Sequence, residues 1–306
     1  MHRYLGFSET TAARGGYVSI GNFDGVHLGH QLMLRTLVEQ AAHHGLPSVV
    51  LTFDPHPISL LRPAQAPPLL TTMDQRAEIF ASLGVEHLIV YPTDHQFLDL
   101  EPGEFFDHIV RRELQARGLV EGPNFFYGRD RAGSIDTLRQ ASTAASIEFT
   151  VIPPVRIEGR LVSSSSVREV LLHGNVNLAA DLLGRPYQVT GTVVHGAERG
   201  RTIGFPTANL HDIPTLLPLD GVYAGRVVID SKYHRAAINL GPNPTFREEQ
   251  RKFEVYILDF SGNLYDRPLT VEFLQRIRDT RKFESLPELL EQVNKDVEFV
   301  RTLASL

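Results

Sequence analysis

The segment GNFDGVHLGHQ, residues 21–31, joins a short apolar run to a stretch with helical periodicity. The run that leads into it, residues 16–23, ends in glycine, asparagine and phenylalanine and predicts a strand. From residue 31 the apolar residues recur at near-helical spacing until Gly45, which predicts a helix. The sequence therefore predicts a strand, a glycine-rich loop and a helix, with His27 and His30 near the beginning of the helix.

The same alternation continues along the next part of the chain. Apolar runs at residues 47–53 and 86–92 predict two more strands, and residues 75–83 between them predict a helix. Strands that alternate with helices are typical of a doubly wound, Rossmann-like α/β domain with a parallel sheet. Ligands bind to such sheets beyond the carboxyl ends of the strands, and the glycine-rich loop lies at the first of these ends.

The pattern changes after residue 187. Several runs rich in β-branched and aromatic residues follow one another, separated by glycine, proline and asparagine and without helical segments. Such runs predict an antiparallel barrel or sandwich. Ser285 and Glu288 then form a capping-box pattern at the start of a C-terminal helix. A length of 306 residues is consistent with two domains, which we place at residues 1–183 and 184–306, with the boundary near Gly184.

Composition excludes several classes of function. A formal net charge of −6 gives no general attraction to nucleic acid or anionic membranes, so any phosphate must be bound by locally placed groups. The chain has no cysteine, which excludes disulfides and thiolate metal sites. It also lacks a signal-peptide pattern and an apolar run of about 20 residues that could span a bilayer. We expect a soluble, cytoplasmic protein without nucleic-acid or membrane partners, and the oligomeric state stays open.

The glycine-rich loop combines the features of an anion site. Side chains three residues apart at the start of a helix lie on one face, so His27 and His30 can both point where the unpaired amide N–H groups point. Glycines allow close approach of a phosphate, and imidazoles can donate to oxygens that gain charge when an α-phosphate is attacked. This favours nucleotidyl transfer, and the alternative is that the histidines only decorate a turn. Four other histidines lack this setting and are expected at the surface: His43, His44, His87 and His95.

The H-x-G-H motif resembles the signature of the adenylyltransferase and class I aminoacyl-tRNA synthetase superfamily. Three further segments make the resemblance more specific: TFDPHP (52–57), GPNFFYGRDRAGS (122–134) and SSSSVREVL (163–171). Together with the loop they resemble the FAD synthetase module of the bifunctional riboflavin kinase/FAD synthetase family. The resemblance implies that residues 1–183 form an α/β nucleotidyltransferase domain that adenylylates FMN.

This resemblance also implies roles for individual residues. His27 and His30 would be catalytic, and Asn124 and Phe125 would contact the flavin. The ATP-binding residues would be Gly21, Asn22, Phe23, Gly29, Ser163, Ser164, Ser165 and Arg168. Hydroxyls and amides at the start of a helix from about Val167, together with a guanidinium, suit an anion. Without the resemblance the serines predict only a helix cap, and the aromatic residues only core packing.

A second motif lies in the β-rich part of the chain. GRTIGFPTANL (200–210) resembles the riboflavin kinase signature, which implies a loop that holds MgATP. Thr207 and Asn209 offer hard oxygen ligands for Mg²⁺ or a similar divalent cation. The ATP-binding residues of this loop would be Gly200, Arg201, Gly204 and Pro206. Taken alone, PTAN could equally be a capped turn.

The kinase reaction needs a base because its nucleophile is a neutral hydroxyl. In KFEVYILDF (252–260), Glu254 matches the family's catalytic base, and strand alternation places it on the face opposite Phe253 and Val255. A solitary strand glutamate is otherwise usually a solvated surface residue. The segment IRDTRKFESLPEL (277–289) resembles the flavin loop, with Arg278 and Phe283 as flavin-binding residues.

The resemblance covers nearly the whole chain, and GVYAG (221–225) and NLGPNPTF (239–246) are further matches. It implies an enzyme that converts riboflavin and ATP to FMN and ADP in a β-barrel kinase domain with a C-terminal helix, and then FMN and ATP to FAD and pyrophosphate. Three positions depart from the family pattern. Ser165 stands where threonine is common, Ser134 where aspartate is frequent, and Asp266 where glycine commonly follows a tyrosine.

Three alternatives have their own sequence requirements. A class I aminoacyl-tRNA synthetase needs a lysine-rich second motif and a tRNA-binding surface, and the sequence shows neither. A pantetheine- or cytidylyl-transferring enzyme does not account for the PTAN segment. A non-catalytic flavin-binding regulator would keep flavin pockets but lose catalytic groups, whereas this chain retains His27, His30, Thr207, Asn209 and Glu254.

Overall fold

The computed structural model describes residues 1–196, 204–243, 245 and 248–303, with the backbone alone at residues 248 and 249. Gly200 and Arg201, two of the predicted ATP-binding residues, lie outside these ranges. The chain divides into two compact units, Met1–Ser164 and Ser165–Leu306. The boundary near Gly184 was predicted for the two catalytic modules rather than for these compact units, and it stays a prediction.

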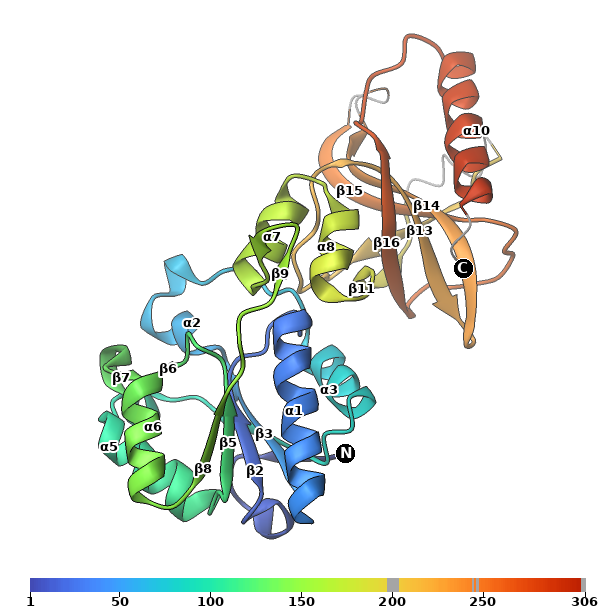
Figure 1. Ribbon diagram of the computed structural model, residues 1–306. Helices are drawn as coiled ribbons and strands as arrows, with labels where there is room; N and C mark the ends of the chain where they lie inside the picture. Colours follow the sequence, from blue (N-terminus) through green and yellow to red (C-terminus); the bar gives the residue numbers. More distant parts are fainter. Residues whose placement is uncertain (197–203, 244, 246–247, 304–306) are drawn as a thin grey trace. The chain divides into compact units, whose positions relative to one another are not determined.

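A six-stranded sheet forms the centre of the first unit, in the order β1-β4-β3-β2-β5-β8 (Figure 1). Each neighbouring pair of strands is parallel, which confirms the predicted α/β class. The strands are β1 (His2–Leu5), β2 (Tyr17–Ile20), β3 (Ser48–Asp54), β4 (His87–Pro92), β5 (Gly118–Glu121) and β8 (Glu148–Val151). Two short antiparallel ribbons accompany the sheet: β6 (Phe126–Tyr127) with β7 (Gly133–Ser134), and β9 (Arg156–Ile157) with β10 (Arg160–Leu161).

Helices connect these strands and cover both faces of the sheet (Figure 1). The α-helices are α1 (Leu28–His44), α2 (Pro57–Leu61), α3 (Met73–Ser82), α4 (His95–Leu98), α5 (Pro102–Phe105) and α6 (Ile135–Ala144). A π-helix, η3, spans Phe106–Glu113, and 3₁₀ turns are η1 (Thr10–Ala13), η2 (Pro63–Gln65) and η4 (Arg129–Arg131). α1 ends at Gly45, whose φ of 64° is the left-handed conformation that commonly terminates helices.

Alternating residues of each strand belong to two separate cores, one on each face of the sheet. Val18 and Ile20 of β2 pack in a core with η3 and α6, whereas Tyr17 belongs to the core that contains α1 and α3. β3 alternates in the same way, with Leu51 in the first core and Val50 in the second. A parallel sheet that is buried on both faces needs apolar side chains at successive positions. This explains why the strands appear in the sequence as nearly continuous apolar runs.

The prediction that His87 lies at the surface is wrong. His87 is 8% exposed because β4 is an inner strand between β1 and β3. Its Nδ1 is hydrogen-bonded to the Tyr4 hydroxyl at 3.0 Å, and its ring stacks on His2. Burial lowers the pKa of His87. The other three histidines of that prediction are exposed.

The strand order places the glycine-rich loop at the topological switch point of the sheet. The chain passes from β2 to β3 on one side, while β5 pairs with β2 on the other side. Connections from the carboxyl ends of these neighbouring strands therefore lead in opposite directions. Doubly wound sheets bind their ligands at this position.

A closed antiparallel barrel forms the centre of the second unit, in the order β11-β12-β15-β14-β13-β16, with β16 pairing back to β11 (Figure 1). This resolves the predicted choice between barrel and sandwich. The strands are β11 (Tyr187–Val194), β12 (Thr207–His211), β13 (Gly221–Ile229), β14 (Lys232–Asn243), β15 (Glu248–Ile257) and β16 (Pro268–Arg278). The helices are α7 (Ser164–Leu172), α8 (Val176–Leu183) and α10 (Leu286–Thr302).

β11 buries every second residue. Tyr187, Val189, Gly191 and Val193 are buried, while Gln188, Thr190, Thr192 and Val194 are partly exposed. α10 lies outside the barrel, where Val297 and Val300 pack in one cluster with side chains of β13 and β14. Ser285 caps α10 by accepting the Glu288 N–H at 3.4 Å, which confirms the predicted helix start. The Glu288 carboxylate takes the Glu284 N–H and not that of the cap residue, so the capping box is only half formed.

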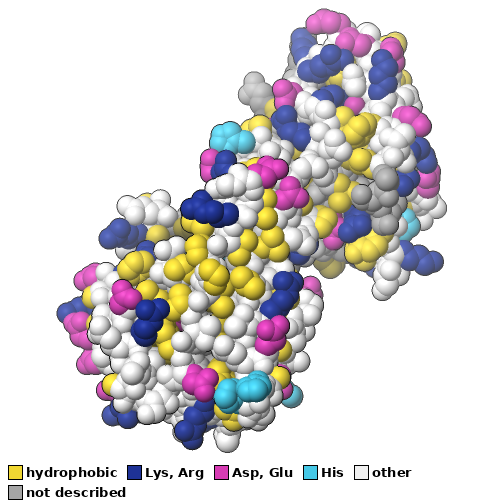
Figure 2. All heavy atoms as spheres, in the orientation of Figure 1, with side chains coloured by type: hydrophobic (Ala, Val, Ile, Leu, Met, Phe, Trp, Pro, Cys, Tyr) yellow, Lys and Arg dark blue, Asp and Glu magenta, His cyan; other side chains and the backbone are white. Residues whose placement is uncertain are grey.

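The distribution of charged side chains and the lengths of the helices are consistent with the composition. Over the face that Figure 2 shows, acidic and basic side chains are interspersed on each unit. Within the described ranges, none of the helices has both the length and the hydrophobicity required to cross a bilayer.

Candidate active sites

A buried ion pair between Asp24 and Arg76 holds the glycine-rich loop. Asp24 is 3% exposed, and its carboxylate accepts hydrogen bonds from the Leu70 N–H and from the N–H and hydroxyl of Thr71. The Arg76 guanidinium lies 3.8 Å from this carboxylate and donates to the carbonyls of Asn22 and Thr71 at 2.9 and 3.1 Å. The pair connects the loop to the start of α3 and fixes the loop backbone. The sequence analysis did not identify Arg76.

The loop backbone adopts conformations that are rare for side-chain-bearing residues. Phe23 has a φ of 50° and Val26 a φ of 40°. For a β-branched residue such as valine, a positive φ is a genuine outlier. The Val26 carbonyl accepts a hydrogen bond from Gln31 Nε2 at 2.9 Å, and the Phe23 ring packs edge-on against Phe80. Strain of this kind persists where surrounding contacts enforce it, and it concentrates at functional sites.

His27 and His30 meet at the N-terminus of α1. His27 is the N-cap residue, and its Nδ1 accepts a hydrogen bond from the His30 N–H at 3.3 Å. The two rings stack, with centroids 3.7 Å apart and planes 20° apart. Because Nδ1 of His27 is an acceptor, the neutral ring carries its proton on Nε2, which becomes a donor. The structure thus brings the two predicted catalytic histidines together.

The His30 ring is enclosed between His27 and Phe23, whose ring centroid lies 5.2 Å away. Its Nδ1 is inaccessible to solvent and has no hydrogen-bond partner among the described residues. Burial of the ring, followed by the nearby charges of His27 and Arg76, holds the pKa of His30 well below its ordinary value. The site therefore contains a neutral imidazole that can form a hydrogen bond without carrying a charge.

Three further predicted residues line the loop. Gly21 donates its N–H to the Leu51 carbonyl at 3.0 Å, and this bond continues the pairing of β2 with β3. Asn22 Oδ1 is buried without a hydrogen-bond partner in the described part of the chain. A Cβ on Gly29 would lie 3.2 Å from the His27 ring, so glycine lets the imidazole pack over the first turn of α1. Buried polar atoms are normally satisfied, so the Asn22 amide retains hydrogen-bonding capacity for a ligand.

The serine segment lies at the start of α7, which begins at Ser164, three residues before the predicted Val167. The Ser164 hydroxyl donates to the Asp24 carbonyl at 2.7 Å, so this serine contacts the glycine-rich loop. Ser163 immediately precedes the helix and is partly buried. Ser165 and Arg168 follow on the same helix and belong to the second unit.

Sequence reasoning missed Glu121, which ends β5 beside β2. It is 1% exposed, and its Oε1 accepts the Ile20 N–H at 2.8 Å. Burial raises the pKa of Glu121 well above its ordinary value, against a smaller opposing effect of the Ile20 N–H. The only sequence signal is a charged residue at the end of an apolar run. A carboxyl group that favours its neutral form therefore lies at the switch point of the sheet.

The predicted flavin contacts of this unit, Asn124 and Phe125, immediately precede β6. Asn124 is exposed, and the partly buried Phe125 ring stacks on Tyr127 with centroids 5.7 Å apart. Phe126 is 47% exposed, and the Arg131 guanidinium lies 4.7 Å from its ring centroid. The segment thus presents an aromatic surface next to an exposed amide.

A cavity of about 360 Å³ also lies in the first unit. Its lining includes Phe7, Tyr91 and Phe97, which are aromatic, and Arg112, which is basic. The predicted site residues are not among those that line it. The predicted site of this unit is therefore separate from this cavity.

In the second unit, Thr207 and Asn209 share one face of β12 because they lie two residues apart. β12 pairs with β15 so that Asn209 lies opposite Glu254. Phe253 and Val255 are buried in the barrel, which leaves Glu254 on the outer face, as strand alternation predicts. Side chains directly opposite each other on antiparallel strands have Cβ atoms about 5 Å apart. The structure therefore brings Thr207, Asn209 and Glu254 together.

Gly196 packs against the Asn209 amide, a contact that the sequence analysis did not predict. A Cβ at this position would lie 2.3–2.9 Å from the three nearest amide atoms. Glycine therefore allows the chain to pass closely over the Asn209 side chain. Of the neighbouring predicted residues, Gly204 is exposed with a φ of 89°, and Pro206 is exposed.

Two asparagines that sequence reasoning did not assign to the site contact Glu254. Asn243 Nδ2 donates to Glu254 Oε2 at 3.0 Å, and Asn239 Nδ2 approaches the same oxygen at 3.4 Å. Asn239 Nδ2 also lies 3.1 Å from Asn243 Oδ1. Both residues belong to the NLGPNPTF segment, which matched the family pattern in the sequence although no role was assigned to its residues.

The donor atoms near Glu254 suit a hard divalent cation. Thr207 offers a hydroxyl oxygen and Asn209 an amide oxygen, and the carboxylate of Glu254 is the neighbouring anion. Within the described ranges, no group of three or more His, Cys, Asp or Glu residues could hold a metal ion. Mg²⁺ usually keeps several waters and binds substrate phosphates, so a cation at Thr207 and Asn209 would need few protein ligands.

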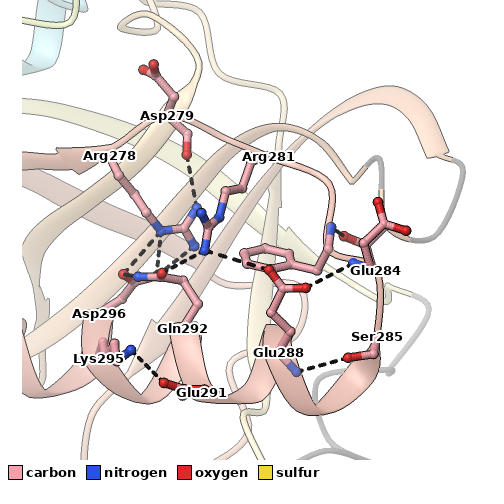
Figure 3. A network of polar contacts seen from close by, with 12 residues as sticks. Arg278, Asp279, Arg281, Glu284, Ser285, Glu288, Glu291, Gln292, Lys295 and Asp296 are labelled. Carbon is pink, nitrogen blue, oxygen red and sulfur yellow. Dashed lines mark hydrogen bonds and ion pairs between the residues drawn. The ribbon is translucent and has the colours of Figure 1, made fainter.

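Arg278 and Phe283 were predicted to bind flavin, and both have protein partners; those of Arg278 include Asp296 of α10 (Figure 3). Arg278 forms a forked ion pair with Asp296, with Nη2 2.7 Å and Nε 3.0 Å from Oδ2. Asp296 also accepts a hydrogen bond from Gln292 Nε2 at 2.9 Å. Phe283 is 5% exposed, and the Arg281 guanidinium lies 4.8 Å from its ring centroid. Arg278 therefore joins the end of β16 to α10, and Phe283 is buried in the segment between them.

Two departures from the family pattern have local structural explanations. Ser134 is the N-cap of α6 and its hydroxyl accepts the Thr137 N–H at 3.3 Å, a role that aspartate performs equally well. Asp266 has a φ of 59°, the left-handed conformation that glycine adopts freely and that aspartate tolerates better than most residues. Both substitutions keep the backbone that the more common residue would give.

Comparison with known families divides the chain into two successive parts. A family model described as FAD synthetase matches residues 9–166, which include His27 and His30. A family model described as riboflavin kinase matches residues 183–304, which include Thr207, Asn209 and Glu254.

Known relatives match nearly the whole chain. The bifunctional riboflavin kinase/FMN adenylyltransferase of Pseudomonas fluorescens is 38% identical over 293 residues, which cover 95% of this chain and 94% of the relative. The protein of the same name from Escherichia coli (strain K12) is 35% identical over 283 residues, 92% of this chain and 90% of the relative. A crystal structure named as a macrolide-efflux protein from Streptococcus pneumoniae matches with a TM-score of 0.88 and 34% identity, over 99% of this chain and 100% of that chain. The name is that of the other protein, and what this chain shares with it is similarity of sequence and fold.

Proposed function

This chain belongs to the bifunctional riboflavin kinase/FMN adenylyltransferase family, and on that premise we propose that it performs both steps that convert riboflavin to FAD. The barrel unit phosphorylates riboflavin with ATP, and the parallel-sheet unit joins FMN to the AMP part of a second ATP. The observation that carries the proposal is that two different family models match successive parts of the chain, each containing one of the two site clusters. We place the corresponding catalytic modules at residues 1–183 and 184–306.

In the adenylylation step, an oxygen of the FMN phosphate attacks the α-phosphorus of ATP. A new P–O bond forms, the bond from the α-phosphorus to the bridging oxygen breaks, and pyrophosphate leaves. The attacking phosphate is already anionic, so no base is needed. His27 Nε2–H, the neutral His30 ring and the first amides of α1 donate to the phosphate oxygens as their charge develops. Additional ATP contacts come from Gly21, Asn22, Phe23, Gly29, Ser163, Ser164, Ser165 and Arg168.

In the kinase step, a riboflavin hydroxyl attacks the γ-phosphorus of ATP. Glu254 accepts the hydroxyl proton, the bond from the γ-phosphorus to the bridging oxygen breaks, and ADP leaves. Thr207 and Asn209 would hold Mg²⁺, which when bound neutralises charge on the ATP phosphates. Their hydroxyl and amide oxygens fit this ion, and Gly204 and Pro206 lie next to them in the loop that we assign to ATP.

The remaining assignments follow the same division. Asn124 and Phe125 contact FMN in the first module, and Arg278 and Phe283 shape the riboflavin site in the second. The substrates are small molecules, and the net charge of −6 gives no reason to expect nucleic acid as a partner. We place both reactions in the cytoplasm, a reducing compartment that suits a chain without cysteine.

The test is product formation by the purified chain with riboflavin, ATP and Mg²⁺, followed by chromatography. FMN and then FAD are expected, whereas bound but unchanged riboflavin would favour a flavin-binding regulator. Glu254→Gln should slow FMN formation by about 10²–10⁴-fold and leave FAD formation from supplied FMN nearly intact. His30→Ala should give the opposite pattern. Equal loss of both reactions in a variant that unfolds at the wild-type temperature would contradict the division between the units.

A further inference from the structure

The carboxylate of Glu254 is held on one side only. Its Oε2 accepts the Asn243 amide at 3.0 Å and lies 3.4 Å from the Asn239 amide. Among the described residues, Oε1 has no hydrogen-bond partner. A carboxylate can accept on both oxygens. The hydrogen bonds therefore select one oxygen for the protein and leave the other for a ligand.

The two asparagines can meet on one oxygen only because β14 is irregular between them. On a regular strand, residues 239 and 243 would be about 13 Å apart, which is beyond the reach of two asparagine side chains joined by one hydrogen bond. The register with β15 shifts between Gly241 and Asn243, and Gly241 has a φ of 128°. A Cβ at Gly241 would also lie 3.0–3.2 Å from the Asp220 side chain. Such irregularities often redirect a side chain next to an active site.

The strand pairing shows from which side the two asparagines contact Glu254. Glu254 lies between Asn209 of β12 and Asn239 of β14 in the register of the barrel. Asn239 and Asn243 thus hold the carboxylate from the β14 side, while Asn209 lies on the opposite side. A carboxylate fixed in this way cannot rotate freely, and its free oxygen keeps one position relative to β12.

We propose that Asn239 and Asn243 are positioning residues that hold Glu254 Oε2, so that Oε1 is the oxygen that accepts the proton of the riboflavin hydroxyl. This proposal rests on the assignment of Glu254 as the base of the kinase step. The asparagines act through Glu254 and do not contact the transferred phosphoryl group. The irregularity at Gly241 is the structural element that makes their joint contact possible.

The test compares steady-state kinetics of riboflavin phosphorylation for Asn243→Ala, Asn239→Ala and a control, Asn294→Ala. Asn294 lies on the exposed face of α10, and among the described residues its amide donates to the Leu290 carbonyl of the same helix alone. We expect Asn243→Ala to lower kcat about 10²-fold, because small misplacements of a catalytic group have effects of this size. Asn239→Ala should have a smaller effect because its contact is longer. The KM for ATP should stay within about twofold of wild type in all three variants, and the control should retain its kcat.

A double-mutant comparison separates positioning from other roles. In a Glu254→Gln background, Asn243→Ala should lower kcat by less than about twofold, because there is no carboxylate left to position. An equal loss of kcat in both backgrounds, or unchanged kcat in the wild-type background, would overturn the proposal. The thermal transition of the barrel unit shows whether each variant is folded, and if Asn243→Ala unfolds this unit at the assay temperature, Asn239→Ala provides the same comparison.

If the assignment of Glu254 as the base is wrong, the kinetic results differ from those expected when only the positioning role is wrong. If Glu254→Gln itself keeps full kinase activity, Glu254 is not the base, whatever the asparagine variants do. If Glu254→Gln is slow while both asparagine variants retain wild-type kcat, the base assignment stands and only the positioning role is refuted.

Discussion

Replacement of Arg76 by alanine should destabilise the first unit more than any exposed substitution on the same helix. Arg76 is 4% exposed and donates to two backbone carbonyls, those of Asn22 and Thr71, while its charge faces the buried Asp24 carboxylate. Removal of the guanidinium leaves these carbonyls without that donor and the carboxylate without its countercharge. The loop that carries His27 would lose the hydrogen bond and the ion pair that connect it to Arg76 of α3.

The expected magnitude follows from the burial of the pair. Removal of one partner from a buried ion pair costs about 3–5 kcal/mol, because the remaining charge stays desolvated. For a unit of the size of Met1–Ser164, each kcal/mol lowers the melting temperature by about 2–4 °C. The transition of this unit should therefore shift down by roughly 6–20 °C.

The assay is differential scanning calorimetry of wild type, Arg76→Ala and the control Arg3→Ala. Arg3 of β1 forms an ion pair at 2.6 Å with Asp74, which lies on α3 like Arg76, but the side chains of Arg3 and Asp74 are 45% and 82% exposed. Such exposed pairs contribute about 1 kcal/mol or less. Both reactions are measured below the transition, and Arg76→Ala should lower FMN adenylylation while riboflavin phosphorylation stays near wild type.

A shift for Arg76→Ala no larger than that for Arg3→Ala would refute the reasoning. It would mean that the loop relaxes at no cost and that the hydrogen bonds of Arg76 are replaced by water. Loss of kinase activity with intact adenylylation would equally contradict the assignment of Arg76 to the first site.

Two further predictions concern a buried acid and a close backbone contact. Burial raises the pKa of Glu121 above its ordinary value of 4.5, so as pH rises from there the unfolded chain loses this proton while the folded chain keeps it. The free energy of unfolding should then fall by up to about 1.4 kcal/mol per pH unit until the folded pKa is reached. In denaturant titrations between pH 5 and 8, Glu121→Gln should remove this pH dependence. If the variant keeps it, another group causes it. Gly196→Ala places a Cβ 2.3–2.9 Å from the Asn209 amide, so the amide must move, and the Mg²⁺ concentration for half-maximal kinase activity should rise several-fold with adenylylation intact. Unchanged Mg²⁺ dependence in that variant would argue against Asn209 as a ligand.

Features that depend on local order along the chain could be predicted before the fold was known. Strand and helix periodicities distinguish a parallel sheet from a run of antiparallel strands, because a sheet buried on both faces needs continuous apolar runs and a barrel needs alternation. The capping of α10 by Ser285 and the position of His27 and His30 at a helix start are also local, since the residues involved are three apart. These features could be predicted from spacing alone.

Contacts between residues far apart in the sequence depend on how the chain folds. Asp24 and Arg76 are separated by 52 residues, and only the packing of α3 against the loop brings them into contact. Glu121 and His87 are buried because of the strands that flank them, and strand order does not appear in the periodicity of any single strand. The contacts of Asn239 and Asn243 with Glu254 need both the register of the barrel and the irregularity at Gly241. A pattern along the chain specifies which face a side chain takes, whereas its neighbours on that face depend on how the strands are paired.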